Sequence, residues 1–280
     1  MSKTAHYSVD SPGKRIRPAL VILVSKALGY SGPMLIPSAS AVEMAHAATL
    51  VHDDMVDNSK LRRGVSSTKY KFGTEVSILT GDYLFAKAFQ IMSKLEDIKL
   101  LEILSDIAIQ MCEGEVFHFT KKGDINISEE EYFEIIKRKT ANFISACCEI
   151  GCRLGRSDER TQKAFVNYGL YLGMAFQIID DILNLTGDEN ITGKPRGSDL
   201  FEGKYSLPVI QLKKVASCPL PVSSAEEIIR LCREFKSFEY AKDVAIRFAD
   251  QAKEEISIFN ASDEINALLL LVDNVIERQY

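Results

Sequence analysis

Residues 50–64 of the chain read LVHDDMVDNSKLRRG, in which three acidic residues are followed within a few positions by basic residues. On a helix, positions 46, 50, 53 and 57 lie on one face, because their spacing is four, three and four. Asp53 and Asp57 then lie one turn apart, which destabilises a bare helix but offers oxygen ligands to a hard cation such as magnesium. The stretch therefore predicts an acidic helix end that binds metal, followed by a basic turn.

A second acidic cluster occurs at residues 176–184, FQIIDDILN. On a helix, Gln177 lies one turn from Asp181, and Asp180 lies one turn from Asn184. Unpaired charge is costly within an otherwise apolar helix, so two such clusters favour a binding function over two solvated helix ends. Magnesium ions bridged by a diphosphate would neutralise the acid. The cations that could hold the remaining phosphate charge are Arg62, Arg63, Lys194 and Lys204.

The apolar residues recur every three or four positions almost throughout, which predicts an all-α protein. The expected helices cover 76–92, 98–119, 128–153, 161–184, 225–235, 240–259 and 262–278, and another begins near Pro37 and leads into the first acidic cluster. Residues 58–74 and 185–208 are interpreted as irregular loops, and no run alternates as a strand does. No Pro/Ser-rich linker divides the chain, so we expect one helical domain over residues 1–280.

Composition excludes several classes of protein. The 280 residues include 39 acidic and 34 basic side chains, a net charge of -5, which argues against a broad nucleic-acid-binding face. No basic leader precedes an apolar run, so no signal peptide is expected, and the longest apolar stretch (267–272) is too short to span a bilayer. The six cysteines favour buried thiols in a reducing compartment over a disulfide framework. We expect a cytoplasmic protein.

Seven motifs, in order, resemble those of the trans-isoprenyl diphosphate synthases, the polyprenyl synthetase family. They are GKRIRP (13–18), HDDMVD with RRG (52–64), EGEV (113–116), KRKTA (137–141), FQIIDD (176–181), GKPRGSDLFEGKYSLP (193–208) and VIERQ (275–279). Each is modest alone, but their shared order argues strongly against chance. The resemblance runs from residue 13 to the end of the chain. It implies an all-α bundle around a deep central cavity, the isoprenoid synthase fold, usually as a homodimer.

The resemblance implies a magnesium-dependent head-to-tail condensation that yields a trans-polyprenyl diphosphate. An allylic diphosphate ionises, the double bond of isopentenyl diphosphate attacks the carbocation, and a proton is lost. Metal and cationic side chains would neutralise the leaving diphosphate, and a dry pocket would protect the carbocation from water. The released diphosphate would accept the proton, so no histidine base is required.

The resemblance also implies roles for individual residues. Magnesium would be bound by Asp53, Asp57 and Asp180. The allylic diphosphate would be held by Arg62, Lys139, Thr140, Gln177 and Lys204, with Lys194 nearby, and isopentenyl diphosphate by Lys14, Arg17, His46 and Arg63. The residues expected to carry catalysis are Asp53, Asp54, Asp57, Lys139, Gln177, Asp180, Asp181 and Lys204.

Small residues before the first acidic cluster favour a long product. One isoprene unit is about as long as one helical turn, roughly 5 Å, so each turn below the metals gauges one unit. In the family, a large aromatic four or five residues before the motif is associated with early termination, whereas Thr49 and Ala48 stand there, with Ala45 further down. Small residues would equally permit close helix packing. We expect a product longer than farnesyl, from hexaprenyl to octaprenyl, with a pocket floor drawn from Phe85, Phe89, Met111, Phe117 and Phe119.

Other interpretations stay open. A geranylgeranyl diphosphate synthase is the alternative product class, and a partner subunit of a heteromeric prenyl synthase is another alternative, although such a subunit should have eroded aspartates. A terpene cyclase would have little use for GKRIRP and Arg63, and a metal-dependent phosphohydrolase would need more histidine ligands. The basic run at 14–17 could be a solvated charge run, and His46 a satisfied, partly buried histidine.

Two features depart from the family pattern. Asn184 stands where the family often has the last aspartate of the second motif, which predicts weaker metal binding because an amide brings no charge. Only thirteen residues precede Lys14, which leaves the first helix and any dimer contact that it makes undetermined.

Overall fold

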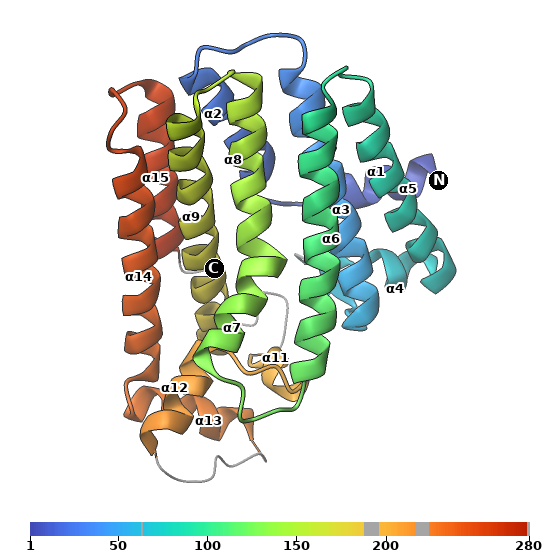
Figure 1. Ribbon diagram of the computed structural model, residues 1–280. Helices are drawn as coiled ribbons and strands as arrows, with labels where there is room; N and C mark the ends of the chain where they lie inside the picture. The colour runs from blue at the N-terminus through green and yellow to red at the C-terminus, as the bar shows by residue number, and fades with distance from the viewer. Residues whose placement is uncertain (63, 188–195, 217–223, 279–280) are drawn as a thin grey trace. The chain divides into compact units, whose positions relative to one another are not determined.

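The computed structural model describes residues 1–62, 64–187, 196–216 and 224–278. These residues are helical almost throughout, which confirms the all-α prediction (Figure 1). Two of the predicted diphosphate ligands, Arg63 and Lys194, lie outside the described residues, as does Cys218.

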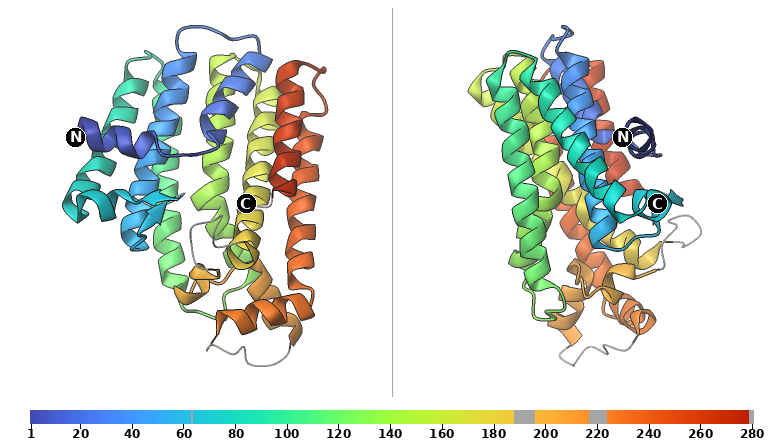
Figure 2. Two further views of the ribbon diagram at one scale, coloured as in Figure 1. Left: turned by 180° about the vertical axis from the view of Figure 1, so that it is seen from behind. Right: turned by 90° about the vertical axis from the view of Figure 1, so that its right-hand side faces the viewer.

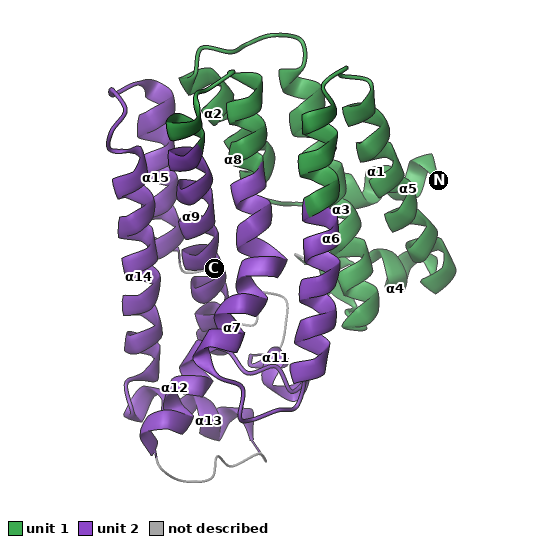
Figure 3. Cartoon of the chain, viewed as in Figure 1, with its two compact units in different colours: residues 1–106, 147–162 green, residues 107–146, 163–280 purple. Residues whose placement is uncertain are grey.

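Contacts between residues divide the chain into two compact units, which Figure 3 colours separately. Unit 1 comprises Met1–Asp106 and Cys147–Gln162, and unit 2 comprises Ile107–Ala146 and Lys163–Tyr280. The chain passes from one unit to the other within three helices: α6 (Ile98–Lys121), α8 (Asn142–Leu154) and α9 (Glu159–Thr186). The single domain over residues 1–280 stays a prediction.

Unit 1 is built around the pair of helices α3 and α5, which pack closely and lie side by side in Figures 1 and 2. Ala47 and Ala48 of α3 and Leu84 of α5 form a core cluster with Ala5 of α1. Besides parts of α6, α8 and α9, the unit contains α1 (Ser2–Val9), α2 (Ile16–Ala27), α3 (Leu35–Val56), β1 (Leu61–Arg62), β2 (Val65–Ser66), α4 (Thr68–Phe72) and α5 (Thr74–Ser93).

The interpretation of residues 58–74 as wholly irregular is wrong. Leu61 pairs with Ser66 and Arg62 with Val65 in a short antiparallel hairpin, and the one-turn helix α4 follows. Each strand has only two residues, so no alternating pattern can reveal it in the sequence. The helices α1, α2, α11 (Ser198–Phe201) and α12 (Leu207–Ala216) are further elements that the periodicity did not predict, and α11 lies within residues 185–208, the other stretch interpreted as irregular.

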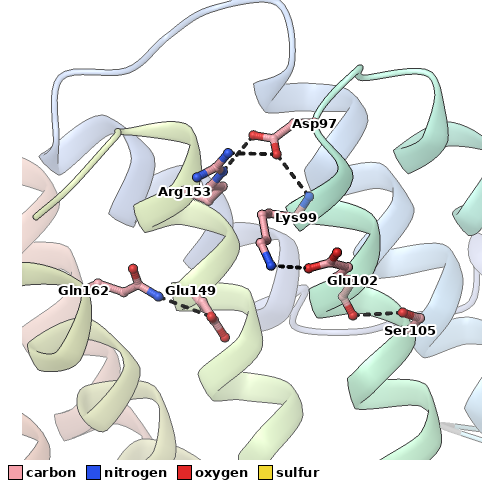
Figure 4. Close-up of polar contacts among 7 residues, drawn as sticks. All are labelled: Asp97, Lys99, Glu102, Ser105, Glu149, Arg153 and Gln162. Atoms are coloured by element: carbon pink, nitrogen blue, oxygen red, sulfur yellow. Dashed lines mark hydrogen bonds and ion pairs between the residues drawn. The ribbon is translucent and has the colours of Figure 1, made fainter. Parts of the chain in front are cut away.

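Polar contacts fasten the start of α6 to α8 within unit 1 (Figure 4). Arg153 donates hydrogen bonds to both carboxylate oxygens of Asp97, over 2.8 and 3.1 Å, and the backbone N–H of Lys99 donates to Asp97 Oδ1 over 3.1 Å. Gln162 Nε2 donates to Glu149 Oε1 over 3.2 Å. Because the Arg–Asp pair is bidentate, it fixes both the distance and the orientation of the residue that precedes α6.

Unit 2 has its core on α9, α12 and α14, where Ile178, Leu207 and Val244 are buried in one cluster. The helices α14 and α15 lie side by side (Figure 2). Besides parts of α6, α8 and α9, the unit contains α7 (Glu129–Ile136), η1 (Lys137–Ala141), α11 (Ser198–Phe201), α12, α13 (Ala225–Glu234), α14 (Ser237–Ile256) and α15 (Asp263–Glu277).

The helix expected over 128–153 begins as predicted but is not continuous. Ser128 Oγ accepts a hydrogen bond from the Glu131 N–H, and the Glu131 carboxylate accepts one from the Ser128 N–H, which is a capping box. The regular α-helix ends at Ile136, and five residues of π-helix, η1, precede α8. Such wide turns occur frequently at functional sites.

Candidate active site

The first acidic cluster lies at the C-terminal end of α3, in unit 1. Asp53 lies in the last turn, Asp57 caps the helix, and both side chains are half-buried. Asp54 is only 3% exposed and accepts hydrogen bonds on one oxygen from Arg62 Nε (2.8 Å) and Arg62 Nη2 (2.5 Å). Arg62 therefore neutralises the buried carboxylate. The C-terminal end of a helix carries partial negative charge, so a cation is favoured beside Asp53 and Asp57.

The hairpin that carries Arg62 is held from outside as well. Tyr7 Oη donates to the carbonyl oxygen of Ser66 over 2.7 Å, and Ser67 Oγ donates to that of Ser59 over 2.6 Å. Lys71 Nζ lies 3.7 Å from the centre of the Tyr7 ring, which fixes that ring in place. Helix α1, the hairpin and α3 thus determine together where the Arg62 guanidinium lies.

The basic residues at the start of α2 contact α3 within unit 1. Arg17 Nη1 lies 3.2 Å from His46 Nε2, so these two predicted ligands of isopentenyl diphosphate are neighbours. Arg15 forms a short ion pair with Glu43 and donates to the carbonyl oxygens of Val9 and Ser11. His46, Asp54 and Arg62 line one pocket of this unit together with Arg15 and Glu43. Lys14 immediately precedes this segment.

The second acidic cluster lies on α9, in unit 2. The side chain of Asp180 is 52% exposed and pairs with Arg278, whose Nη2 lies 2.9 Å from Asp180 Oδ1. The half-buried Asp181 accepts hydrogen bonds from Tyr132 Oη (2.7 Å) and from Gln177 Nε2 (2.8 Å). Desolvation raises the pKa of Asp181 to about 7, although both hydrogen bonds oppose the rise. In each Asp–Asp pair, the second aspartate (Asp54 or Asp181) therefore accepts hydrogen bonds from other side chains of the protein.

The π-helix η1 contains Lys139 and Thr140, which lie in unit 2, as the second acidic cluster does. Thr140 Oγ1 donates to Gln177 Oε1 over 2.7 Å. Lys139 forms a short ion pair with Glu115 and lies 3.2 Å from His118 Nδ1. The structure therefore brings Thr140, Gln177 and Asp181 into one chain of hydrogen bonds, and Lys139 is adjacent to that chain in η1.

The loop after α9 carries Lys204, a side chain that is 15% exposed and pairs with Glu202 Oε2 over 2.7 Å. Asn184 fixes the start of α11, because its side-chain Nδ2 donates to Ser198 Oγ over 3.0 Å and its backbone carbonyl oxygen accepts from the Gly197 N–H over 2.8 Å. Asn184, the residue that departs from the family pattern, thus stabilises the start of α11. The weaker metal binding expected from this residue stays a prediction.

The predicted chain-length residues lie on α3, and two of them are part of the core of unit 1. Ala45 and Ala48 are 1% and 0% exposed, and Ala48 packs in the cluster that contains Leu84 of α5. Thr49 is half-buried, and its Oγ1 donates to the His46 carbonyl oxygen over 2.7 Å. Among the floor candidates, Phe85 and Phe89 belong to unit 1, whereas Met111, Phe117 and Phe119 belong to unit 2.

The donor set of each acidic cluster suits a magnesium ion that also binds phosphate. Within the described ranges, no three His, Cys, Asp or Glu side chains form a site that could hold a metal by themselves. Magnesium is commonly bound by one or two carboxylates together with substrate phosphates, which is what one or two partly exposed aspartates on a helix offer. No helix in the part of the chain that the structure describes is long and apolar enough to cross a membrane.

Three residues that contact the candidate site were not assigned a role from the sequence. Tyr132 lies 49 positions before Asp181, and no sequence signal links the two. Glu115 belongs to the EGEV motif and shares a helical face with His118, a spacing that could have indicated a common partner. Arg278 belongs to the VIERQ motif, which matched the family without an assigned role.

Comparisons with known proteins identify the relatives of this chain. The family described as Polyprenyl synthetase matches residues 1–237. The geranylgeranyl diphosphate synthase of Methanosarcina mazei is 36% identical, over 99% of this chain and 90% of that protein. The octaprenyl diphosphate synthase of Haemophilus influenzae is 34% identical, over 98% of this chain and 87% of that protein.

Solved structures give the same result. A polyprenyl synthase from Caulobacter crescentus CB15, complexed with calcium and isoprenyl diphosphate, has a TM-score of 0.92 at 33% identity and covers 100% of this chain and 89% of its own. A decaprenyl diphosphate synthase from Rhodobacter capsulatus has a TM-score of 0.91 at 32% identity, over 99% and 90% of the two chains.

Proposed function

The chain belongs to the polyprenyl synthetase family and is a trans-prenyltransferase, a prenyl diphosphate synthase, and on that premise we propose which of its residues carry the reaction. The observation that supports the proposal is that the two aspartates of each Asp–Asp pair differ in their solvent exposure and in their hydrogen bonds. Asp53 and Asp180 are at least partly exposed, whereas Asp54 and Asp181 are hydrogen-bonded to Arg62 and Gln177, two expected diphosphate ligands.

We propose that Asp53, Asp57 and Asp180 bind magnesium. All three offer hard oxygen donors that solvent reaches, as a magnesium–diphosphate site requires. Bound magnesium would stabilise the negative charge that develops on the leaving diphosphate. Asp180 is paired with Arg278 in this structure, so that guanidinium neutralises the carboxylate.

The allylic diphosphate would be held by Arg62 in unit 1 and by Lys139, Thr140, Gln177 and Lys204 in unit 2, with Lys194 adding positive charge. Asp54 and Asp181 would act on the reaction by orienting Arg62 and Gln177, respectively. Side chains oriented before substrate arrives stabilise developing charge without a cost of reorganisation. Isopentenyl diphosphate would be held by Lys14, Arg17, His46 and Arg63, and the released diphosphate would accept the proton.

We propose a product longer than farnesyl, from hexaprenyl to octaprenyl, because the residues before Asp53 include no aromatic plug at Ala45, Ala48 or Thr49. The relative from Haemophilus influenzae is named as an octaprenyl diphosphate synthase. The second candidate is a geranylgeranyl diphosphate synthase, because the relative from Methanosarcina mazei carries that name. The mass of the main product made from a farnesyl primer distinguishes the two.

We also propose that the enzyme works as a homodimer in the cytoplasm. Helix α5 supports the dimer, because four of its apolar side chains, Val76, Ile78, Leu79 and Tyr83, are 37 to 54% exposed. Exposed apolar patches commonly mark protein contacts. The five described cysteines are free thiols, as expected in a reducing compartment. Leu79→Asp should convert the dimer to a monomer in analytical ultracentrifugation; a wild-type monomer would contradict the proposal.

The proposed metal ligands can be tested against a matched control. Asp53→Asn and Asp180→Asn should each lower the rate of isopentenyl incorporation at least about a hundredfold at limiting magnesium, because each removes one carboxylate ligand. Asp250→Asn is the control, since Asp250 is an exposed aspartate of α14 outside both clusters. Equal losses in all three variants would contradict the assignment. Isothermal titration with magnesium and inorganic diphosphate provides a second readout that does not depend on turnover.

A further inference from the structure

The EGEV motif, residues 113–116 on α6, lies directly against η1 within unit 2. A Cβ atom built on Gly114 would lie 2.6 Å from Arg138 Cβ and 3.3 Å from the backbone nitrogen of Lys139. Side-chain Cβ atoms do not approach other heavy atoms closer than about 3 Å because repulsion rises steeply there, so only glycine lets the two helices come this close. Gly114 therefore determines how near η1 lies to α6.

A glutamate on each side of this glycine pairs with a cation of η1. Glu113 Oε2 lies 3.6 Å from Arg138 Nη1, and Glu115 forms the short ion pair with Lys139. The two pairs differ in solvent access, because the side chains of Glu115 and Lys139 are 22% and 26% exposed, whereas that of Glu113 is 59% exposed. Water screens the outer pair more than the inner one, so the inner pair should be the stronger.

Two more contacts restrict this segment. His118, one turn after Glu115, places its Nδ1 3.2 Å from the Lys139 ammonium. On the other side of η1, a Cβ on Gly173 would lie 2.5 Å from Ala141 Cα, so a second glycine lets α9 approach just as closely. A lysine ammonium on its four-carbon stem is otherwise free to adopt many conformations. Here the backbone is held between two glycines, and the ammonium lies between Glu115 and His118.

We propose that Glu115 is a positioning residue, which orients the Lys139 ammonium for the diphosphate of the allylic substrate. The inference rests on the proposed role of Lys139 as a ligand of that diphosphate. An ammonium that is already ordered loses less conformational freedom when substrate binds, and this strengthens binding and transition-state stabilisation.

A different role for Glu115 has the opposite effect. If its charge merely competed with the diphosphate for Lys139, removing that charge would strengthen substrate binding. If Glu115 orients Lys139, removing the charge leaves the ammonium mobile and weakens the reaction. The sign of the change in kcat/KM for the allylic diphosphate therefore decides between the two roles.

The test is Glu115→Gln, which keeps the shape and a hydrogen-bonding oxygen but removes the charge. We expect kcat/KM for the allylic diphosphate to fall about tenfold, the factor that corresponds to one charge-assisted hydrogen bond. KM for isopentenyl diphosphate should stay within about twofold of the wild-type value. The thermal midpoint should stay within a few degrees of wild type. Glu113→Gln is the matched control, and its kinetic constants should change less than about twofold because its ion pair is exposed. An unchanged or increased kcat/KM in Glu115→Gln would overturn the inference.

Repeating the test in the Lys139→Gln variant distinguishes a failure of this inference from a failure of the proposed role of Lys139. In Lys139→Gln, adding Glu115→Gln should change kcat/KM no further, and a second, independent loss would overturn the positioning role. If Lys139→Gln alone has wild-type kinetics, the proposed function of Lys139 fails. The pairing is then tested by urea unfolding, where the shifts in midpoint of the two single variants should not add in the double variant. Additive shifts would show that the two side chains do not interact.

Discussion

Tyr132 Oη donates a hydrogen bond to Asp181 Oδ2 over 2.7 Å and joins α7 to α9. The other oxygen of Asp181 accepts from Gln177, and the carbonyl oxygen of that amide accepts from Thr140. Three hydrogen bonds thus run from α7 through α9 to η1. Such a network, once fully paired, holds each member in one orientation, so Gln177 and Thr140 are ordered before any substrate binds.

Tyr132→Phe should break this network at its start. Tyr132 is 3% exposed, so the substitution leaves Asp181 Oδ2 without its hydrogen-bond donor, while Oδ1 still accepts from Gln177. We expect the free energy of unfolding to fall by about 1–3 kcal/mol, the cost of an unsatisfied buried group, and kcat/KM for the allylic diphosphate to fall with it. The control is Tyr240→Phe, whose hydroxyl bonds to Glu129 outside the network. An equal kinetic loss in the control would contradict the role of Tyr132.

Two glycine substitutions should differ in cost. In Gly173→Ala the new methyl group meets Ala141 Cα at 2.5 Å, and backbone cannot move aside without displacing η1. In Gly81→Ala it meets His52 Nε2 at 2.2 Å, but His52 is a partly exposed side chain that can rotate away. Gly173→Ala should therefore cost about 1–3 kcal/mol of unfolding free energy and Gly81→Ala clearly less. Chemical denaturation measures both, and the reverse order would be inconsistent with the rigid contact.

Chain length should respond to bulk on α3 in two distinguishable ways. Thr49→Tyr places an aromatic ring at a half-buried position, so the main product should become shorter while stability is retained. Ala48→Tyr should also shorten the product, but Ala48 is fully buried against Leu84, so this variant should additionally lose about 1–3 kcal/mol of stability through overpacking. Thr49→Val is the isosteric control and should keep the wild-type product. Unchanged chain length in both tyrosine variants would reject this pocket assignment.

The Asp97–Arg153 pair in Figure 4 predicts a pH-dependent stability. The hydrogen bond from Arg153 holds the pKa of the Asp97 carboxyl below its ordinary value of 3.8. A carboxyl whose pKa is lower in the folded state stabilises the fold above its unfolded pKa, and this contribution is lost as the pH falls through the folded value. Asp97→Asn should therefore reduce the free energy of unfolding by up to about 1 kcal/mol near neutral pH, and the difference from wild type should narrow below about pH 4.

Glu102→Gln serves as the control for that experiment. Its ion pair with Lys99 joins two exposed side chains three residues apart, so we expect little change in stability at any pH. Urea unfolding followed across the acid range gives the comparison. A difference between wild type and Asp97→Asn that stays constant from neutral to strongly acidic pH would contradict the pairing.

The sequence predicted the features that depend on local spacing. The long helices, the capping box at Ser128 and the acidic clusters of α3 and α9 follow from periodicity and from short motifs. The hairpin at 61–66 has strands too short for a pattern. The π-helix η1 packs against Gly114 and Gly173, which lie 24 and 32 residues from the residues that they contact, Arg138 and Ala141. Contacts such as Tyr132–Asp181 arise only from tertiary packing, so no local rule predicts them.

The most direct test of the central claim is the size of the product. The purified protein is incubated with magnesium, labelled isopentenyl diphosphate and a series of allylic primers, and the products are separated by chain length. We predict metal-dependent incorporation and a main product longer than farnesyl, from hexaprenyl to octaprenyl, with incorporation lost in Asp53→Asn. No elongation with any primer, or elongation that Asp53→Asn leaves intact, would contradict the account.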